Sequence, residues 1–325
     1  MIASLATVLS RYPAAIRPLT PPESLGNAGG LSGARLWRFR SQLGPTVARA
    51  WPPGVTRTHL AQIHGWLKRA DRLDFVAAPF AAIDGATFQA ENGIFWEVCR
   101  WMPGEADLKL PPPIAKVRAA MSGLAAFHQV MGPSEVKLFC PGLADRSREI
   151  RKLLGGDSTS WRQVVLAHPP DPRRELALRW LDLASVVAPG IDAEISRFAG
   201  SKTRVQTVIR DARPQHFLFT GDVLTGLVDF GAMGIDTVAA DLARLIADWI
   251  EPDRVLRGEA LAAYARVRPL DSAEMMLIEA FERSSSLLGG GRWLKWHFVD
   301  RIVFEDPNAS LRGLQRGVER IEGLI

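Results

Sequence analysis

A short β-rich segment, residues 204–228, interrupts a mostly helical half of the sequence and constrains the fold more than any other feature. Its turn, Thr220-Gly221-Asp222, predicts a tight hairpin. Asp211 falls in the loop that enters this hairpin, and Asp229 follows the hairpin's second strand. We therefore expect both carboxylates at the rim of one small sheet, facing a common cavity. The expected strands are residues 204–209, 216–219 and 223–228.

The character of the sequence changes near residue 105. Before it, short β-like runs alternate with turn signals around one amphipathic helix, whereas helical periodicity dominates after the three prolines at 111–113. The expected early strands are residues 34–39, 45–51, 75–79 and 94–101, with a helix at 58–70. Later helices are expected at residues 114–128, 173–187, 191–198, 239–250, 254–265, 272–288 and 293–304.

Composition excludes several classes of protein. The 325 residues are 47% hydrophobic and 23% charged, enough for a buried core. No apolar run approaches the roughly 20 residues that span a bilayer, so no membrane association is expected. Two cysteines, Cys99 and Cys140, lack disulfide or zinc-site spacing, which favours a reducing cytoplasm.

The formal net charge of +5 permits a polyanionic partner without requiring one. The arginines are scattered rather than clustered with aromatic residues, so we expect no nucleic-acid binding and favour a small ligand that carries phosphate. Examples are Arg146, Arg148, Arg151, Arg173 and Arg174.

The acidic residues of the hairpin region follow an order that is typical of phosphoryl transfer. Asp211 is followed five residues later by His216, and Asp229-Phe230-Gly231 comes after the hairpin. In that chemistry one aspartate accepts the hydroxyl proton, a residue five places on holds a metal, and a second aspartate holds Mg²⁺. Carboxylate oxygens are the hard ligands that Mg²⁺ prefers.

With these and other motifs, the chain resembles the aminoglycoside phosphotransferase and choline-kinase-type family of the protein-kinase-like fold. The resemblance implies an α+β, two-lobed fold, with a small β-rich N-terminal nucleotide-binding lobe at 1–104. A larger helical C-terminal lobe at 105–325 would hold the catalytic loop and the substrate region. The motifs are Ala48-Arg49, Trp101-Met102-Pro103-Gly104-Glu105, Leu124-Ala125-Ala126-Phe127-His128, Asp211 with Phe217-Leu218, Asp229-Phe230-Gly231, and Asp236 with Asp241-Leu242-Ala243.

By this resemblance, Asp211 is the catalytic carboxylate, Asp229 is the Mg²⁺ ligand, and Asp241 braces the catalytic loop. Backbone groups of Glu97, Val98 and Cys99 would meet adenine at the hinge. From the residues alone, Asp211 and Asp229 also fit turn aspartates, and Asp241 also fits a helix N-terminal acid.

The chain departs from the family pattern at three positions. His216 stands where the family usually has asparagine, Ile209 where it has histidine, and Arg49 where it has the lysine that pairs with nucleotide phosphates. The resemblance implies ATP with Mg²⁺. Imidazole suits Mn²⁺ or Zn²⁺ better than Mg²⁺, so Mn²⁺ is the alternative ion; His216 would otherwise bond Asp211 or fill space. Residues 52–70 contain no acid that could pair with Arg49, which leaves phosphate or solvent as its partner.

Two further features carry alternative interpretations. The segment 26–33, with Gly29 and Gly30 at its centre, could bring backbone N–H groups to phosphate, but its spacing does not match G-x-G-x-x-G and also fits a flexible turn. Trp293 and Trp296, near Asp300, resemble substrate-facing residues of the family's late helices. Aromatic residues at helical spacing are more often part of the core.

Two functions remain open at this point. The favoured one is an ATP-dependent phosphotransferase acting on a hydroxyl of a small molecule, because both acidic positions are present. The alternative is a degenerate kinase-like protein that binds nucleotide or a partner without transferring phosphate. An aminoglycoside acceptor is disfavoured, since a polycation requires an acidic pocket and this chain is net basic.

Overall fold

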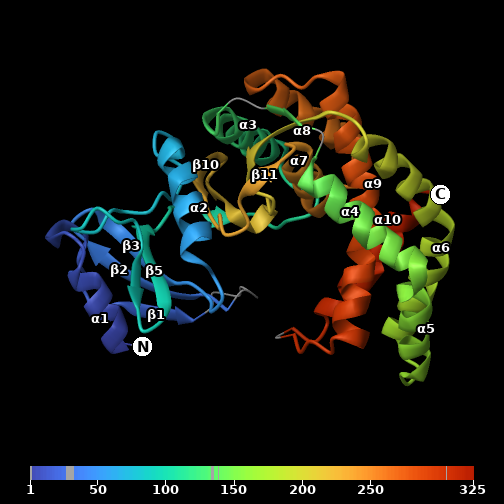
Figure 1. The fold of residues 1–325 in the computed structure, drawn as a ribbon, viewed down its shortest axis with the longest axis horizontal. Helices are drawn as coiled ribbons and strands as arrows, with labels where there is room; N and C mark the ends of the chain where they lie inside the picture. Colours follow the sequence, from blue (N-terminus) through green and yellow to red (C-terminus); the bar gives the residue numbers. More distant parts are fainter. Residues whose placement is uncertain (1, 27–32, 133–134, 138, 305) are drawn as a thin grey trace. The chain divides into compact units, whose positions relative to one another are not determined.

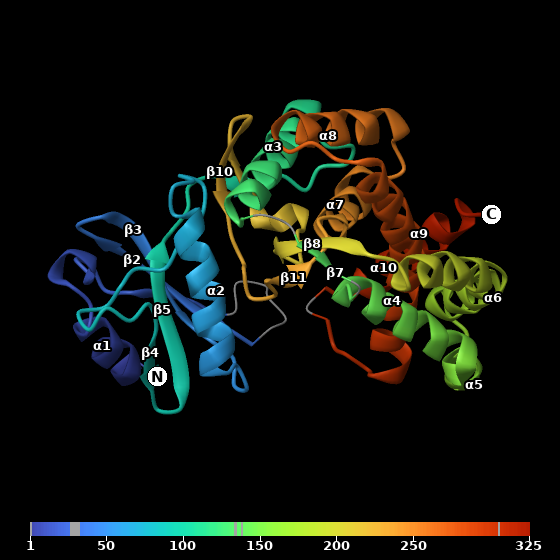
Figure 2. The same ribbon diagram turned by 45° about the horizontal axis from the view of Figure 1, so that its top comes forward.

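The computed structural model describes residues 2–26, 33–132, 135–137, 139–304 and 306–325. The chain forms two compact units, drawn as ribbons in Figures 1 and 2. The first comprises Met1–Gly132 and Pro214–Gly234, and the second comprises Pro133–Arg213 and Ile235–Ile325. No helix in the described ranges has both the length and the apolar character of a membrane span.

A five-stranded antiparallel sheet forms the first part of unit 1, in the order β1-β2-β3-β5-β4. Its strands confirm the alternation expected at 34–39, 45–51 and 94–101. The elements are α1 (Ile2–Ser10), η1 (Ala14–Ile16), β1 (Glu23–Gly26), β2 (Arg35–Ser41), β3 (Gly44–Ala50), α2 (Arg57–Ala70), β4 (Gln89–Glu91) and β5 (Ile94–Arg100).

The two faces of this sheet have different chemistry because side chains alternate along a strand. One face buries Trp37, Ala48 and Trp96 against apolar residues of α1. On β3 and β5, Arg49 and Glu97 are direct partners in register, one residue along from the core positions Ala48 and Trp96, and so they belong to the opposite face. An arginine and a glutamate therefore lie side by side on that face of the sheet.

Unit 1 continues with the elements that lead to and from the hairpin. A three-stranded sheet has the order β10-β9-β6, and the hairpin confirms the turn expected at residues 220–222. Residues 75–79, expected as a strand, form only isolated bridges, Val76 to Leu227 and Pro79 to Cys99. The elements are β6 (Glu105–Ala106), α3 (Ile114–Val130), η3 (Pro214–His216), β9 (Phe217–Thr220) and β10 (Val223–Leu227).

The first unit extends past residue 104, where the sequence placed the lobe boundary. The reason is that β6 pairs with β9, and α3 packs against β10. The division of nucleotide binding and catalysis between lobes 1–104 and 105–325 stays a prediction.

Unit 2 combines a small sheet, in the order β11-β8-β7, with a body of helices. Figure 2 shows the long helices α6, α9 and α10 lying beside one another, in agreement with their mutual packing. The elements are β7 (Glu135–Lys137), α4 (Pro141–Lys152), η2 (Leu153–Asp157), α5 (Ser158–Ala167), α6 (Pro172–Ala199), β8 (Thr203–Val208), β11 (Gly234–Asp236), α7 (Ala239–Leu245), η4 (Ile246–Ile250), α8 (Arg254–Val267), α9 (Ser272–Leu294), η5 (Lys295–Val299) and α10 (Ala309–Glu322).

Two helix boundaries expected from the sequence are wrong. Helix α6 continues through Pro189, because a stripe of buried residues on both sides of the proline holds it against its neighbours. Helix α9 continues through Gly289-Gly290-Gly291, because buried residues on both sides of the glycines hold it against its neighbours. A Cβ atom added at Gly317 of α10 would lie 2.5 Å from the Cα of Gly290, so glycine is required where these two helices cross.

The helix crossing yields a stability prediction. Gly317→Ala forces α9 and α10 apart and should lower the free energy of unfolding by about 1–3 kcal/mol, measured by urea denaturation. Gly258→Ala on α8 is the matched control, because a Cβ there meets nothing within 4 Å. That control should stabilise by up to about 1 kcal/mol through helix propensity. Equal stability of the Gly317→Ala variant and the parent would contradict the tight crossing.

Candidate active site

In unit 1, Arg49 lies between two carboxylates. Its Nη2 atom is 3.2 Å from Oδ1 of Asp229, and its Nη1 atom is 3.9 Å from Oε1 of Glu97. The guanidinium Cζ atom lies 4.0 Å from the centre of the Trp51 ring. Only 16% of the Arg49 side chain is exposed, so ring contact and partial burial hold the cation in one place.

Glu97, one of the two carboxylates beside Arg49, lies on strand β5, and helix α2 supplies a histidine that contacts it. His64 on α2 places Nε2 2.7 Å from Oε2 of Glu97 and Nδ1 2.8 Å from Oγ1 of Thr87. His64 and Glu97 are both buried. The sequence predicts an amphipathic helix at 58–70 but gives His64 no role in it. A polar residue on the core-facing side of a helix that contains no acid could have indicated this contact.

The expected hinge residues lie within the sheet. The carbonyl of Val98 accepts a hydrogen bond from the backbone N–H of Phe80 at 2.7 Å, and Cys99 bridges Pro79. Cys99 is buried, and burial raises the pKa of its thiol. The Glu97 side chain contacts Arg49 and His64, while adenine contact at Glu97 and Cys99 stays a prediction.

Asp229 and His216 lie together at the base of the hairpin. The Nε2 atom of His216 is 3.7 Å from Oδ2 of Asp229, and Val228 donates a backbone hydrogen bond to the carbonyl of His216 at 3.1 Å. Asp229 has a φ of 61°, a left-handed conformation that is costly for a residue with a side chain. Its carboxylate is 47% exposed, whereas the His216 side chain is 11% exposed.

This pair fits a divalent cation. The two ligand atoms are close enough for one ion to contact both, and Mg²⁺ is commonly held by one or two protein ligands while phosphate and water complete its shell. Among the described residues no group of three or more His, Cys, Asp or Glu side chains is arranged to enclose a metal. The arrangement therefore suits an ion that arrives with a phosphate ligand.

In unit 2, Asp211 lies in the loop after β8 and is paired with arginines. Its Oδ1 atom accepts a hydrogen bond from Nε of Arg213 at 2.7 Å, and Nη2 of Arg244 is 3.6 Å away. The Asp211 side chain is 34% exposed. The carboxylate is thus held by fixed cations and still meets solvent.

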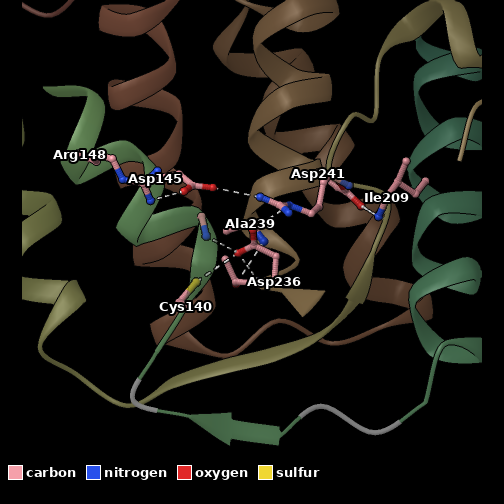
Figure 3. A network of polar contacts seen from close by, with 10 residues as sticks. Cys140, Asp145, Arg148, Ile209, Asp236, Ala239 and Asp241 are labelled. Atoms are coloured by element: carbon pink, nitrogen blue, oxygen red, sulfur yellow. Dashed lines mark hydrogen bonds and ion pairs between the residues drawn. The ribbon is translucent and has the colours of Figure 1, made fainter. Parts of the chain in front are cut away.

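Asp241 of α7 holds the backbone of the same loop. Its carboxylate accepts hydrogen bonds from the N–H groups of Ile209, at 2.8 Å, and Arg210, at 2.6 Å. Figure 3 shows the Asp241 side chain pointing at Ile209. Asp241 and Ile209 are fully buried, and Arg210 has a φ of 66°. The two hydrogen bonds therefore fix a strained turn directly before Asp211.

Asp236 connects the start of helix α4 to Arg210 of the loop before Asp211. Its Oδ1 atom accepts hydrogen bonds from the thiol of Cys140 and the backbone N–H groups of Gly142 and Thr237, as Figure 3 shows in part. Nε of Arg210 is 3.5 Å from the other oxygen. Burial raises the pKa of Asp236, and these contacts act in the opposite direction. The buried carboxylate thus links α4 to the loop.

The remaining expected residues fall into two groups. Gly29 and Gly30 lie outside the described residues. Trp293 and Trp296 stack edge to face with ring centres 5.2 Å apart, and a Cβ at Gly313 of α10 would collide with the Trp293 ring, so Trp293 packs in the helical body. A substrate-facing role for this pair stays a prediction.

The structure brings the expected residues together in two sets. Arg49, Glu97, His216 and Asp229 form one set in unit 1, and Asp211 with Asp241 forms the other in unit 2. The chain crosses between the units at Arg213 and Pro214, between Asp211 and His216. A common cavity for Asp211 and Asp229 stays a prediction.

Comparison with known proteins gives concordant matches. A homoserine kinase of Mesorhizobium japonicum is 32% identical over 172 residues, covering 49% of this chain and 52% of that protein. This chain thus spans about half the length of that relative. An aminoglycoside phosphotransferase structure from Alicyclobacillus acidocaldarius superposes with a TM-score of 0.69 at 18% identity, covering 98% of this chain and 93% of the other. Amicoumacin kinase in complex with AMP-PNP and Ca²⁺ superposes with a TM-score of 0.61 at 14% identity, covering 96% and 91%.

These structures confirm the α+β, protein-kinase-like fold expected from the sequence. A family model described as "Phosphotransferase enzyme family", APH, matches residues 25–276, which is most of the chain. The match includes every motif that the sequence resemblance used. The chain therefore belongs to the phosphotransferase enzyme family.

Proposed function

We propose that this protein transfers the γ-phosphoryl group of ATP to a hydroxyl group of a small molecule. One observation carries the proposal: the family's two acidic positions, Asp211 and Asp229, are both present, and each carboxylate is paired with an arginine. Phosphoryl transfer needs little covalent chemistry from the protein, so positioned charges are its main requirement.

Asp211 is the residue that would act on the acceptor. Its carboxylate is held by Arg213 and reaches solvent, so it is suited to orient the acceptor hydroxyl and accept its proton. Asp241 would act through the backbone of the loop by fixing Ile209 and Arg210. It is a positioning residue in this scheme.

The nucleotide would use groups from unit 1. Asp229 and His216 would hold Mg²⁺ or Mn²⁺, and the ion when bound neutralises charge on the phosphates. Arg49 would add a guanidinium held by Glu97 and the Trp51 ring. Backbone groups at Gly29 and Gly30 would cover phosphate, and the strand at Glu97 and Cys99 would meet adenine.

The compared proteins do not identify the compound that accepts the phosphoryl group. One is a homoserine kinase and another an aminoglycoside phosphotransferase, so the family accommodates different hydroxyl compounds. Both cysteines are unpaired, which fits a reducing cytoplasm. We infer no nucleic-acid partner, since a small hydroxyl substrate and a nucleotide account for the site.

The first functional prediction concerns Asp211. Asp211→Asn should lower kcat for phosphoryl transfer by about 10²–10⁴-fold, because the amide cannot accept the hydroxyl proton, while ATP affinity stays nearly unchanged. Turnover is followed by ADP release with a panel of hydroxylated metabolites, and ATP affinity by thermal shift. Asp222→Asn, at the exposed hairpin turn, is the control and should behave like the parent. Equal turnover in the Asp211→Asn variant would remove this residue from the mechanism.

The same assay decides between the two functions. A parent protein that ATP stabilises but that turns over no acceptor with Mg²⁺ or Mn²⁺ would be a nucleotide-binding protein without transfer activity.

The second prediction concerns the metal. His216→Asn should raise activity with Mg²⁺ relative to Mn²⁺, because an amide oxygen replaces an imidazole nitrogen as ligand. The ratio of kcat/KM values for ATP with the two ions is the measured quantity. An unchanged ratio would place His216 outside the coordination shell.

The third prediction concerns Arg49. Arg49→Met preserves the apolar stem but removes the charge, and should weaken ATP binding by about tenfold or more in a calorimetric titration. Arg38→Met on the neighbouring strand is the control, since its partner is the exposed Glu23. Equal weakening in both variants would indicate a general effect of charge rather than a phosphate contact.

A further inference from the structure

Four arginines from separate segments of unit 2 lie within electrostatic reach of one another, and two of them contact Asp211. Arg146 lies on α4, Arg213 in the loop after β8, Arg244 on α7 and Arg292 near the end of α9. We call these four residues the arginine cluster. Their positions in the sequence are far apart, so only the fold brings them together.

Arg146 is held in place by uncharged groups. Its Nε atom donates to Oγ of Ser284 at 2.9 Å, and its Nη2 atom donates to Oγ of Ser285 at 3.2 Å. The guanidinium Cζ atom lies 4.0 Å from the centre of the Phe281 ring. Among the described residues no carboxylate lies within 4 Å of it. Its orientation is therefore fixed while its charge has no counter-ion at contact distance.

Arg213 and Arg244 connect the cluster to the catalytic aspartate. Arg213 donates to Asp211 at 2.7 Å, and Nη2 of Arg244 is 3.6 Å from the same Oδ1 atom. Nε of Arg244 is 3.2 Å from Oδ2 of Asp248, one turn along the helix. Arg213 and Arg244 are therefore paired with two aspartates, Asp211 and Asp248.

Arg292 adds a fourth cation without a partner. In the part of the chain that the structure describes, its side chain makes no hydrogen bond or ion pair. Arg292 is exposed to solvent; partial desolvation and the charge of Arg213 lower its pKa, while Asp248, Asp211 and Glu149 act in the opposite direction. Burial also lowers the pKa of Arg146 to about 10, with Asp236 opposing and Arg244 and Arg292 adding to the effect. The four cations are thus within electrostatic reach of one another.

Ion pairs are distributed unevenly among the four arginines. Asp211 and Asp248 lie within 4 Å of Arg213 and Arg244, whereas in the described residues Asp236 acts on Arg146, and Asp248, Asp211 and Glu149 act on Arg292, only from beyond ion-pair distance. Cations held close together repel one another. An anionic ligand would relieve this repulsion, whereas a cationic ligand would increase it.

We propose that the phosphoryl acceptor is a hydroxy acid, whose carboxylate is bound by Arg146 and Arg292 of the arginine cluster while its hydroxyl lies at Asp211. The planar fork of guanidinium matches the two oxygens of a carboxylate. This substrate class rests on the proposed phosphotransferase function. In the reaction, the acceptor oxygen bonds to the γ-phosphorus, the bond from that phosphorus to the bridging oxygen breaks, ADP leaves, and the hydroxyl proton goes to Asp211.

The test compares three acceptors of equal chain length and different charge: 4-hydroxybutyrate, 1,4-butanediol and 4-amino-1-butanol. Binding is measured by calorimetry in the absence of ATP, and turnover by ADP release in its presence. The acid should have the highest affinity and the highest kcat/KM, by about tenfold or more over the diol, and the amino alcohol the lowest. Equal values for the three compounds, or no binding of the acid, would overturn the proposal.

Arginine variants test where the carboxylate of the hydroxy acid binds. Arg146→Gln and Arg292→Gln should each raise KM for 4-hydroxybutyrate about tenfold or more and reduce the preference over the diol, with KM for ATP unchanged. Arg292 is exposed and makes no hydrogen bond or ion pair with another described residue, so its variant remains informative if the Arg146 variant is unstable. Arg148→Gln is the control, because Arg148 lies on the same helix, exposed and paired with Asp145, as Figure 3 shows. A rise in KM for ATP alone would assign the cluster to the nucleotide and overturn the proposal.

The two proposals fail in different ways. If transfer from ATP occurs without regard to acceptor charge, the hydroxy-acid inference is wrong and the phosphotransferase function stands. If the acid binds, the arginine variants abolish that binding, and no acceptor is phosphorylated, the anion site stands and the transfer function is wrong.

Discussion

The buried carboxylate of Asp241 is the interaction on which the candidate site depends. Two backbone N–H groups, those of Ile209 and Arg210, point at one fully buried side chain, and both would be orphaned without it. Their position stabilises the left-handed turn at Arg210, which sets the direction of the chain into Asp211. Arg210 in turn reaches Asp145 and Asp236, so the loop, α4 and α7 share one polar network.

A second constraint explains how the chain tolerates its departures from the family pattern. The helix after β3 has no acid to pair with Arg49, but Glu97 on the adjacent strand takes that place, and His64 from the helix supports Glu97. The acid that pairs with the cation therefore lies on a strand instead of the helix, and the helix contributes the supporting histidine. The cation itself remains beside Asp229. A longer, planar cation and a strand-borne acid therefore form a consistent pair, whereas either change alone would leave a charge uncompensated.

Local chemistry in the sequence predicted much of this architecture. Turn residues at 220–222 predicted the hairpin, and short β-like runs between turn signals predicted the strands near 34–39, 45–51 and 94–101. The order of acids pointed to Asp211 and Asp229. Contacts between distant residues were not predictable, which is why the His64–Glu97 pair and the arginine cluster were missed. Helices α6 and α9 run through proline and glycine because tertiary packing outweighs local propensity. The paired geometry of Asp211 and Asp229 stays a prediction.

The excursion of residues 214–234 into the first unit makes both units discontinuous in sequence. Strand β6 finds its partner β9 more than a hundred residues later, so a polypeptide cut after residue 132 would leave an unpaired strand edge. Neither unit can be excised as one uninterrupted fragment. During synthesis the first unit is completed only after residues 133–213, nearly half of the second unit, have been made.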